Sequence, residues 1–107
     1  MATVHQGVAY LTGQVPADET LDADVGVQTA SVLSRIDALL AQVGSSKERV
    51  LSATVFLTED GPSFDAMNAV YDKWVSPGAA PARTTVTRVG MANPKWKVEI
   101  QIIASVK

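Results

Sequence analysis

The fold of this chain is decided by its central segment, which reads VLSATVFL over residues 50–57. Every second position is apolar, namely Leu51, Ala53, Val55 and Leu57. Because successive side chains of a strand point to opposite faces, the pattern predicts a β-strand with one thoroughly apolar face. Such a face needs a covering layer, and the sequence on either side of the strand supplies two helical patterns.

The segment before this strand, residues 25–43, has the spacing of an amphipathic helix. Apolar or small residues recur three and four positions apart, so we expect one buried stripe. Asp22 or Asp24 is a candidate N-cap, and Gly44 is a candidate C-cap. The stripe consists of Thr29, Val32, Leu33, Ile36, Leu39, Leu40 and Val43.

A second helix is predicted after the strand, from Ser63 as its N-cap to about Val75. Its apolar stripe also carries Asn68. This amide needs hydrogen-bond partners, because an unsatisfied buried amide costs roughly 1–3 kcal/mol. The stripe consists of Phe64, Met67, Tyr71, Trp74 and Val75.

The remaining elements are strands. Residues 4–12 predict two strands around a tight turn, and residues 83–89 and 97–106 predict the last two strands. The resulting order indicates one domain over residues 1–107 of the α+β class, a sandwich in which two helices cover one face of a mixed sheet. The other sheet face is largely apolar or Thr, so we expect self-association to cover it.

Composition excludes several functional classes. With 9 basic and 11 acidic residues, a net charge of -2 and no concentration of Lys or Arg, nucleic acid is not an expected partner. The chain has no Cys and only one His, His5, so no metal site or thiol chemistry is expected. Neither a secretion signal nor a run of about 18 apolar residues occurs, so we expect a cytoplasmic protein without a membrane partner.

Two charged residues stand among β-branched residues in the last two predicted strands, Arg83 and Glu99. An Arg on a rigid strand can hold a carboxylate with two parallel hydrogen bonds, and a Glu can move protons. The pair therefore predicts a small carboxylate-bearing substrate. The structural alternative is a salt bridge between Arg83 and Glu99 at an interface.

Five short motifs follow one another along the chain: YLTGQVP at residues 10–16, QT at 28–29, NAVY at 68–71, PAR at 81–83 and VEI at 98–100. In this order and at these separations they resemble the reactive-intermediate deaminase family, also called RidA or YjgF. The resemblance covers nearly the whole chain.

The resemblance implies a chorismate-mutase-like fold assembled as a homotrimer, with helices outside, sheets in a central barrel-like core and three sites at subunit interfaces. It also implies an enzyme. Well-studied members hydrolyse 2-imino acids, or their enamine tautomers, to 2-keto acids and ammonia, and so repair damage caused by these intermediates. No cofactor is expected, since the imine carbon is already electrophilic.

Carried over residue by residue, the resemblance assigns Arg83 to the substrate carboxylate and Glu99 to the water or proton step. It places Asn68, Thr12 and Gly13 at the substrate-binding site. Thr85 stands where many members have Cys, and we expect it to contact the nitrogen side of the substrate.

Two further differences from the family pattern lie at the N-terminus and in the loop over residues 91–96. The family's Gly-Pro-Tyr stretch, whose Tyr lines the site, would lie upstream of Met1. Residues 91–96 differ from the short Leu-Pro turn of the best-known deaminases, which indicates a neighbouring subfamily with its own substrate range. Trp96 in this loop could cover a cleft or pack on a neighbouring subunit.

Two other functions stay open at this point. A binding module could use Arg83 to sense a keto acid or an amino acid without turnover, and the missing tyrosine favours this alternative. A chorismate-mutase-type rearrangement would need several cations around a dicarboxylate, and only Arg88, Lys95 and Lys97 are near in sequence.

Overall fold

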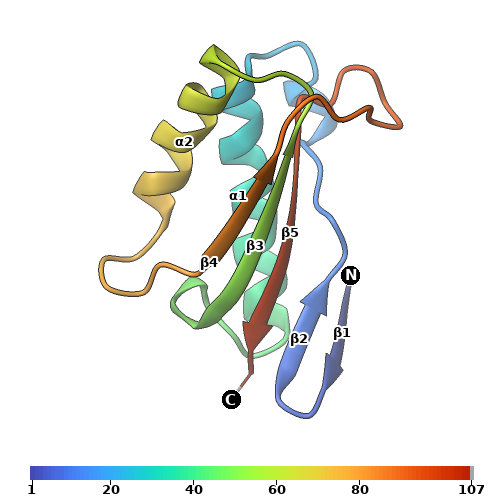
Figure 1. Cartoon of the computed structure of the whole chain (residues 1–107). Helices are drawn as coiled ribbons and strands as arrows, with labels where there is room; N and C mark the ends of the chain where they lie inside the picture. Colours follow the sequence, from blue (N-terminus) through green and yellow to red (C-terminus); the bar gives the residue numbers. More distant parts are fainter. Residues whose placement is uncertain (107) are drawn as a thin grey trace.

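The computed structural model describes residues 1–106, and its main elements follow the predicted order (Figure 1). The strands are β1 (Ala2–His5), β2 (Val8–Leu11), β3 (Val50–Leu57), β4 (Ala82–Val86) and β5 (Val98–Ser105). The helices are α1 (Val25–Gln42) and α2 (Pro62–Trp74), and two short 3₁₀ helices are η1 (Asp18–Thr20) and η2 (Lys47–Arg49).

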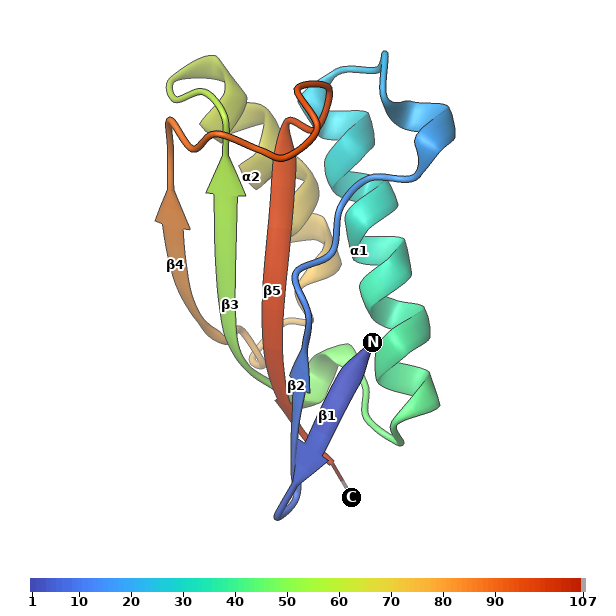
Figure 2. The same ribbon diagram turned by 90° about the vertical axis from the view of Figure 1, so that its right-hand side faces the viewer.

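The five strands form one mixed sheet in the order β1-β2-β5-β3-β4. β3 and β4 are parallel and are connected through α2, whereas the other neighbouring strands are antiparallel. Both helices lie on the same face of the sheet, and in the part of the chain that the structure describes no helix covers the other face (Figures 1 and 2). The predicted α+β class, mixed sheet and one-sided helix layer are confirmed.

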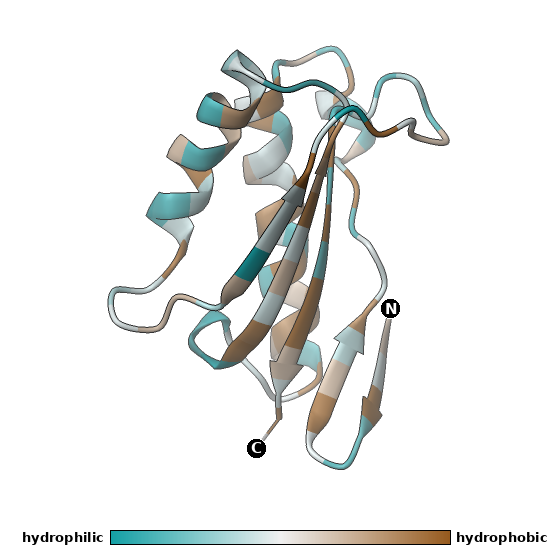
Figure 3. Cartoon of the chain, in the orientation of Figure 1, coloured by the Kyte–Doolittle hydropathy of each residue, from teal (hydrophilic) through white to brown (hydrophobic). Residues whose placement is uncertain are grey.

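The hydrophobic core lies between the two helices and the sheet. Buried side chains of α1, such as Ile36 and Leu40, belong to the same cluster as buried residues of β3 and β5, including Val55 and Ile100. Hydrophobic residues accordingly concentrate on the central strands (Figure 3). Complete burial of one such aliphatic side chain stabilises the fold by roughly 1.5–3 kcal/mol, so this layer fixes the positions of both helices on the sheet.

The ends of α1 match the sequence prediction. The Asp24 carboxylate accepts a hydrogen bond from the backbone N–H of Val27 at 3.0 Å, so Asp24, and not Asp22, is the N-cap. Gly44 follows the helix with φ of 74°, the left-handed conformation that a residue without Cβ adopts at low cost.

The predicted start of α2 is wrong. The N-cap is Gly61, the helix begins at Pro62, and the Ser63 side chain makes no capping bond. Proline suits the first helical position because its missing N–H would have no partner inside the helix. The φ of Gly61 is 58°, which a Ser would adopt only with strain.

Two details of the strands also differ from the prediction. A register shift between Val50 and Ser52 places Leu51 off the apolar face, where it is 50% exposed. Such a bulge inserts one residue into a strand and so breaks the simple alternation. The predicted strand over residues 83–89 ends at Val86, because Arg88 has a φ of 61°, which is incompatible with a strand.

The uncovered sheet face exposes apolar side chains. Tyr10 is 45% exposed and Val86 is 40% exposed, and both alternate with side chains that face the helices. Neither helix in residues 1–106 has the length and hydrophobicity needed to cross a lipid bilayer.

Candidate functional site

Arg83 lies on the edge strand β4 and faces helix α2. In the parallel register it is paired with Ala53, a buried residue on the helix side of β3. Its guanidinium Nη1 donates a hydrogen bond to Asn68 Oδ1 at 2.5 Å. Its Cζ lies 4.8 Å from the centre of the Tyr71 ring and 5.8 Å from the centre of the Phe64 ring.

Phe64, Asn68 and Tyr71 form what we call the α2 cradle. Spaced by four and three residues, they share one side of the helix. The amide of Asn68, which the sequence analysis predicted to need a partner, finds one in Arg83. The sequence pattern predicts Tyr71 and Phe64 only as members of the apolar stripe, and the signal that they also contact Arg83 is the amide between them on the same stripe.

The positive charge of Arg83 is not neutralised by a carboxylate of residues 1–106. Within residues 1–106, salt bridges join Arg88 to Asp60 and Lys95 to Asp22, and none involves Arg83. The side chain is half-buried and rests on aromatic rings, where a bare cation interacts with water less well than at an open surface. An unneutralised guanidinium in this setting is suited to an external anion.

Glu99 lies on β5 and points to the uncovered sheet face, because its neighbours Val98 and Ile100 are buried toward the helices. Its carboxylate lies directly against Gly13. A Cβ at position 13 would overlap Glu99 Oε2. The backbone around Gly13 is held beside β5 by two hydrogen bonds between Gln14 and Ile100, of 2.9 and 3.1 Å.

The structure therefore contains two half-sites, Arg83 with Asn68 and Glu99 with Gly13, and one chain does not bring them together. Arg83 points to the helix face and Glu99 to the opposite face. On that opposite face Glu99 neighbours Phe56, and Phe56 neighbours Val86, which is three residues beyond Arg83 on β4. A salt bridge between Arg83 and Glu99 of the same chain is absent from the described residues.

The two predicted threonines are divided between these half-sites. Thr85 lies two residues after Arg83 on the same side of β4, and its buried hydroxyl has no hydrogen-bond partner within residues 1–106. Thr12 precedes Gly13, and its hydroxyl donates to the backbone oxygen of Met1 at 3.1 Å. Thr85 thus belongs with Arg83 and Thr12 with Glu99.

Burial also affects Tyr71, whose exposed fraction is 4%. Burial raises the pKa of its hydroxyl above the ordinary value of 10.0, and the nearby charge of Arg83 opposes this shift. The hydroxyl therefore stays protonated and uncharged at neutral pH. A neutral Tyr71 cannot act as a counter-ion for Arg83.

A buried glutamine, which the sequence pattern marks only as part of the QT motif, positions the start of β5. Gln28 is fully buried, and its Nε2 donates to the backbone oxygens of Thr20, Leu21 and Lys95. Its Oε1 accepts from the backbone N–H of Lys97 at 2.8 Å. We call this arrangement the Gln28 clamp.

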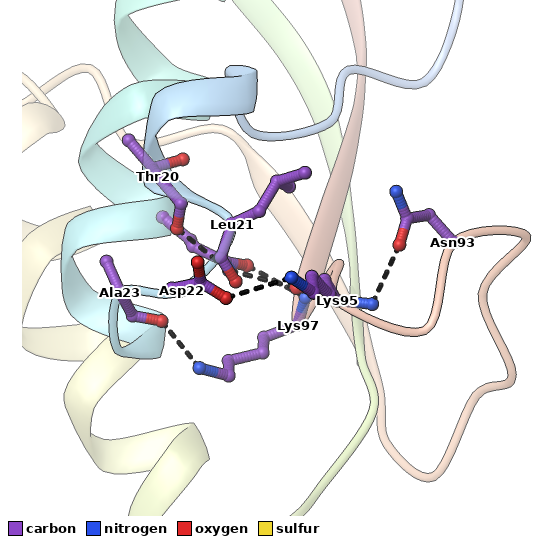
Figure 4. Close-up of polar contacts among 8 residues, drawn as sticks. Thr20, Leu21, Asp22, Ala23, Asn93, Lys95 and Lys97 are labelled. Carbon is purple, nitrogen blue, oxygen red and sulfur yellow. Dashed lines mark hydrogen bonds and ion pairs between the residues drawn. The ribbon is translucent and has the colours of Figure 1, made fainter.

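Surface contacts reinforce the Gln28 clamp (Figure 4). The ammonium group of Lys97 donates to the backbone oxygen of Ala23, and that of Lys95 forms an ion pair with Asp22 at 3.1 Å. These contacts join the loop before β5 to the segment before α1. Lys97, in this loop, is two residues before Glu99. The neighbouring Trp96 has a buried ring N–H without a hydrogen-bond partner in the described part of the chain.

Comparison with known proteins settles the family. The family model described as Endoribonuclease L-PSP, which is the RidA/YjgF family, matches residues 1–106. The chain belongs to this family. Residues 1–106 of this RidA/YjgF protein contain both half-sites, so each lies within the matched region.

Sequence relatives of this RidA/YjgF protein agree with the assignment. A RutC family protein named YoaB, from Escherichia coli strain K12, is 50% identical over 103 residues, covering 96% of this chain and 86% of the relative. A RutC family protein from Haemophilus influenzae is 42% identical over 103 residues, covering 96% of this chain and 86% of its own.

Solved structures show the same fold. A YjgF-family protein from Neisseria meningitidis superimposes with a TM-score of 0.90 at 40% identity, covering 99% of this chain and 85% of the other. Yeast Mmf1 superimposes with a TM-score of 0.86 at 26% identity, with coverage of 99% and 85%. The predicted RidA-type, chorismate-mutase-like fold is thereby confirmed.

Proposed function

We propose that this RidA/YjgF protein hydrolyses small 2-imino acids, or their enamine tautomers, to 2-keto acids and ammonia. The observation that carries the proposal is Arg83, a half-buried guanidinium seated in the α2 cradle without a carboxylate partner in residues 1–106. A planar guanidinium binds a carboxylate through two parallel hydrogen bonds, which would hold the substrate at its acid end.

The reaction requires a base and a nitrogen that is protonated before it leaves. In the proposed mechanism Glu99 takes a proton from water, and the oxygen adds to the imine carbon while the C=N double bond becomes a single bond. The nitrogen takes up the proton that Glu99 removed from water and a second proton from solvent. The C–N bond then breaks, ammonia leaves, and the added hydroxyl releases its proton to Glu99 or solvent as the keto group forms. Thr85 contacts the nitrogen side. Acid–base assistance of this kind contributes roughly 10²–10⁴-fold.

A site that uses both Arg83 and Glu99 requires more than one copy of the chain, because the two residues face opposite sides of one sheet. We propose a homotrimer in which the uncovered sheet faces pack together and each cleft combines the Arg83 half-site of one copy with the Glu99 half-site of its neighbour. The exposed Tyr10 and Val86 on the uncovered face support such packing.

The family description mentions a ribonuclease, but the charge distribution favours a small anion as the ligand. The net charge is -2, and no stretch of the sequence concentrates basic residues that could follow a phosphate backbone. One Arg in an aromatic cradle fits a single carboxylate better than a polyanion.

The proposal is tested by coupling an amino-acid oxidase to the protein and following ammonia release from freshly formed imino acids. Arg83→Ala is expected to reduce the accelerated release at least 100-fold, and Arg83→Lys, which keeps the charge without the planar fork, to recover only part of it. Lys73→Ala serves as a control, since Lys73 is an exposed residue at the end of α2. Unchanged release in Arg83→Ala contradicts the proposal.

A second candidate is a carboxylate-binding protein without catalytic turnover. It is favoured by the separation of Glu99 from Arg83 within one chain, because binding needs only the Arg83 half-site. Calorimetric titration with pyruvate distinguishes the two candidates. Pyruvate binding that depends on Arg83, together with ammonia release no faster than in buffer, supports the binding protein.

A further inference from the structure

The closest group to the Arg83 charge in the α2 cradle, apart from Asn68, is an aromatic ring. The Tyr71 ring centre lies 4.8 Å from Arg83 Cζ, nearer than the Phe64 ring at 5.8 Å. A cation within about 6 Å of a ring face is attracted by the electron density of the ring. Asn68 accepts a hydrogen bond from one nitrogen of the guanidinium, and the guanidinium carbon lies over the Tyr71 ring.

We propose that Tyr71 is a positioning residue for Arg83, whose ring face fixes the orientation of the guanidinium so that it can take a carboxylate in a two-bond grip. The inference rests on the carboxylate-binding part of the proposed function, and not on the hydrolysis step. A long Arg side chain on an edge strand has considerable rotamer freedom, which it would otherwise lose on binding the ligand.

The aromatic ring, and not the hydroxyl, carries this role. The Tyr71 hydroxyl is buried and has no hydrogen-bond partner within residues 1–106, so it contributes no bond that would fix Arg83. Because the hydroxyl is uncharged at neutral pH, the cation keeps its capacity for an external anion. An anionic group at this position would occupy the guanidinium and compete with the substrate carboxylate.

Two substitutions distinguish an effect of the aromatic ring on Arg83 from an effect of general packing at position 71. Tyr71→Met keeps an apolar side chain without a ring, and Tyr71→Phe keeps the ring without the hydroxyl. We expect pyruvate to bind Tyr71→Met about tenfold more weakly in calorimetric titration, within the range that a lost cation–ring contact allows. Tyr71→Phe, the conservative variant, should restore the affinity to within about twofold.

The kinetics should show the same division. If imino-acid hydrolysis is present, Tyr71→Met should raise KM about tenfold with kcat nearly unchanged at saturation, since the grip on the acid end is weakened. Equal pyruvate affinity in Tyr71→Met and the wild type overturns the inference, as does an equal loss in Tyr71→Phe. If the wild type binds pyruvate but does not hydrolyse imino acids, the proposed enzymatic function is contradicted. The pyruvate affinities of the two variants then still test the positioning role of Tyr71.

The wild-type protein offers an independent measurement in case Tyr71→Met does not fold. The side-chain Nε–H signal of Arg83 in an NMR spectrum should be displaced from those of Arg35, Arg49 and Arg88 by the ring current of Tyr71. Substitution Arg83→Lys identifies the signal by removing it. An Arg83 signal at the position of an exposed arginine contradicts the contact and overturns the inference.

Discussion

At the scale of single residues, Gly13 is required by the side chain that lies against it. A Cβ at this position would overlap the Glu99 carboxylate, yet the φ of Gly13 is outside the left-handed region. Gly13→Ala should therefore leave the backbone unstrained and displace the end of a flexible Glu. We expect ammonia release to fall at least tenfold while the free energy of unfolding changes by less than about 1 kcal/mol.

The matched control for Gly13→Ala is Gly90→Ala. A Cβ at position 90 meets nothing within 4 Å, and the φ of Gly90 also lies outside the left-handed region. This variant should keep both stability and ammonia release. Equal ammonia release from the two variants in the oxidase-coupled assay would show that the position of the Glu99 carboxylate does not matter for the reaction.

Tyr71 makes the stability of the fold depend on pH in the alkaline range. Burial raises the pKa of its hydroxyl above 10.0 in the folded state, so the unfolded chain loses this proton first as the pH rises. The unfolded state then binds fewer protons, and the free energy of unfolding falls above pH 10. Urea denaturation at pH 8 and above pH 10 should show a smaller decrease for Tyr71→Phe than for the wild type.

The same variant has an expected effect at neutral pH. Removal of a buried hydroxyl without a hydrogen-bond partner should leave the fold as stable or up to about 1 kcal/mol more stable. Tyr10→Phe is the control, because the Tyr10 ring is on the uncovered face and 45% exposed. A clear loss of stability in Tyr71→Phe at pH 7 would mean that the hydroxyl does have a partner.

At the scale of the elements, the Gln28 clamp joins α1 to the loop that leads into β5. Gln28→Leu nearly preserves the side-chain volume but removes the partner of the Leu21 and Lys95 backbone oxygens and of the Lys97 N–H, whereas the Thr20 oxygen keeps a bond from the Ala23 N–H. We expect the free energy of unfolding to fall by about 2–4 kcal/mol. Urea denaturation measures this, and Gln42→Leu at the exposed end of α1 should change it by less than about 1 kcal/mol.

The same elements show which features the sequence could predict. The period of the apolar residues predicts both helices and the central strand, because burial against a single layer imposes it, whereas the other four strands are predicted as short apolar runs bounded by turn residues. The start of α2 at Gly61 and the exposure of Leu51 could not be read from that period, since they depend on a left-handed turn and on a register shift. The side of the sheet that Arg83 faces depends on its pairing with Ala53, which only the folded chain defines.

At the scale of the whole molecule, the candidate site is divided. The residue types at Arg83 and Glu99 were sufficient to predict a carboxylate-bearing ligand, but not that one chain separates them on two faces of its sheet. In the proposed function their cooperation is therefore a property of the homotrimer. It requires a neighbouring copy that places its Glu99 half-site beside the α2 cradle, with the apolar side chains of the uncovered faces packed between the copies.

A mixing experiment tests whether the site is shared between copies. Arg83→Ala and Glu99→Gln chains, each inactive alone, are co-expressed or refolded together in equal amounts. If each site takes Arg83 from one copy and Glu99 from the next, one of the three sites in every mixed trimer combines two intact residues, which is about a quarter of all sites after random assembly. Ammonia release should then return to about a quarter of the wild-type rate.

The control mixes Arg83→Ala chains with chains that carry both substitutions. No chain in this mixture has an intact Arg83, so ammonia release should not recover. If both residues acted within the same chain, no mixture could restore activity, because every chain in the first mixture lacks one of the two residues. Mixed assemblies of the expected mass in light scattering, together with no recovery of ammonia release, would therefore contradict a site formed between neighbouring copies.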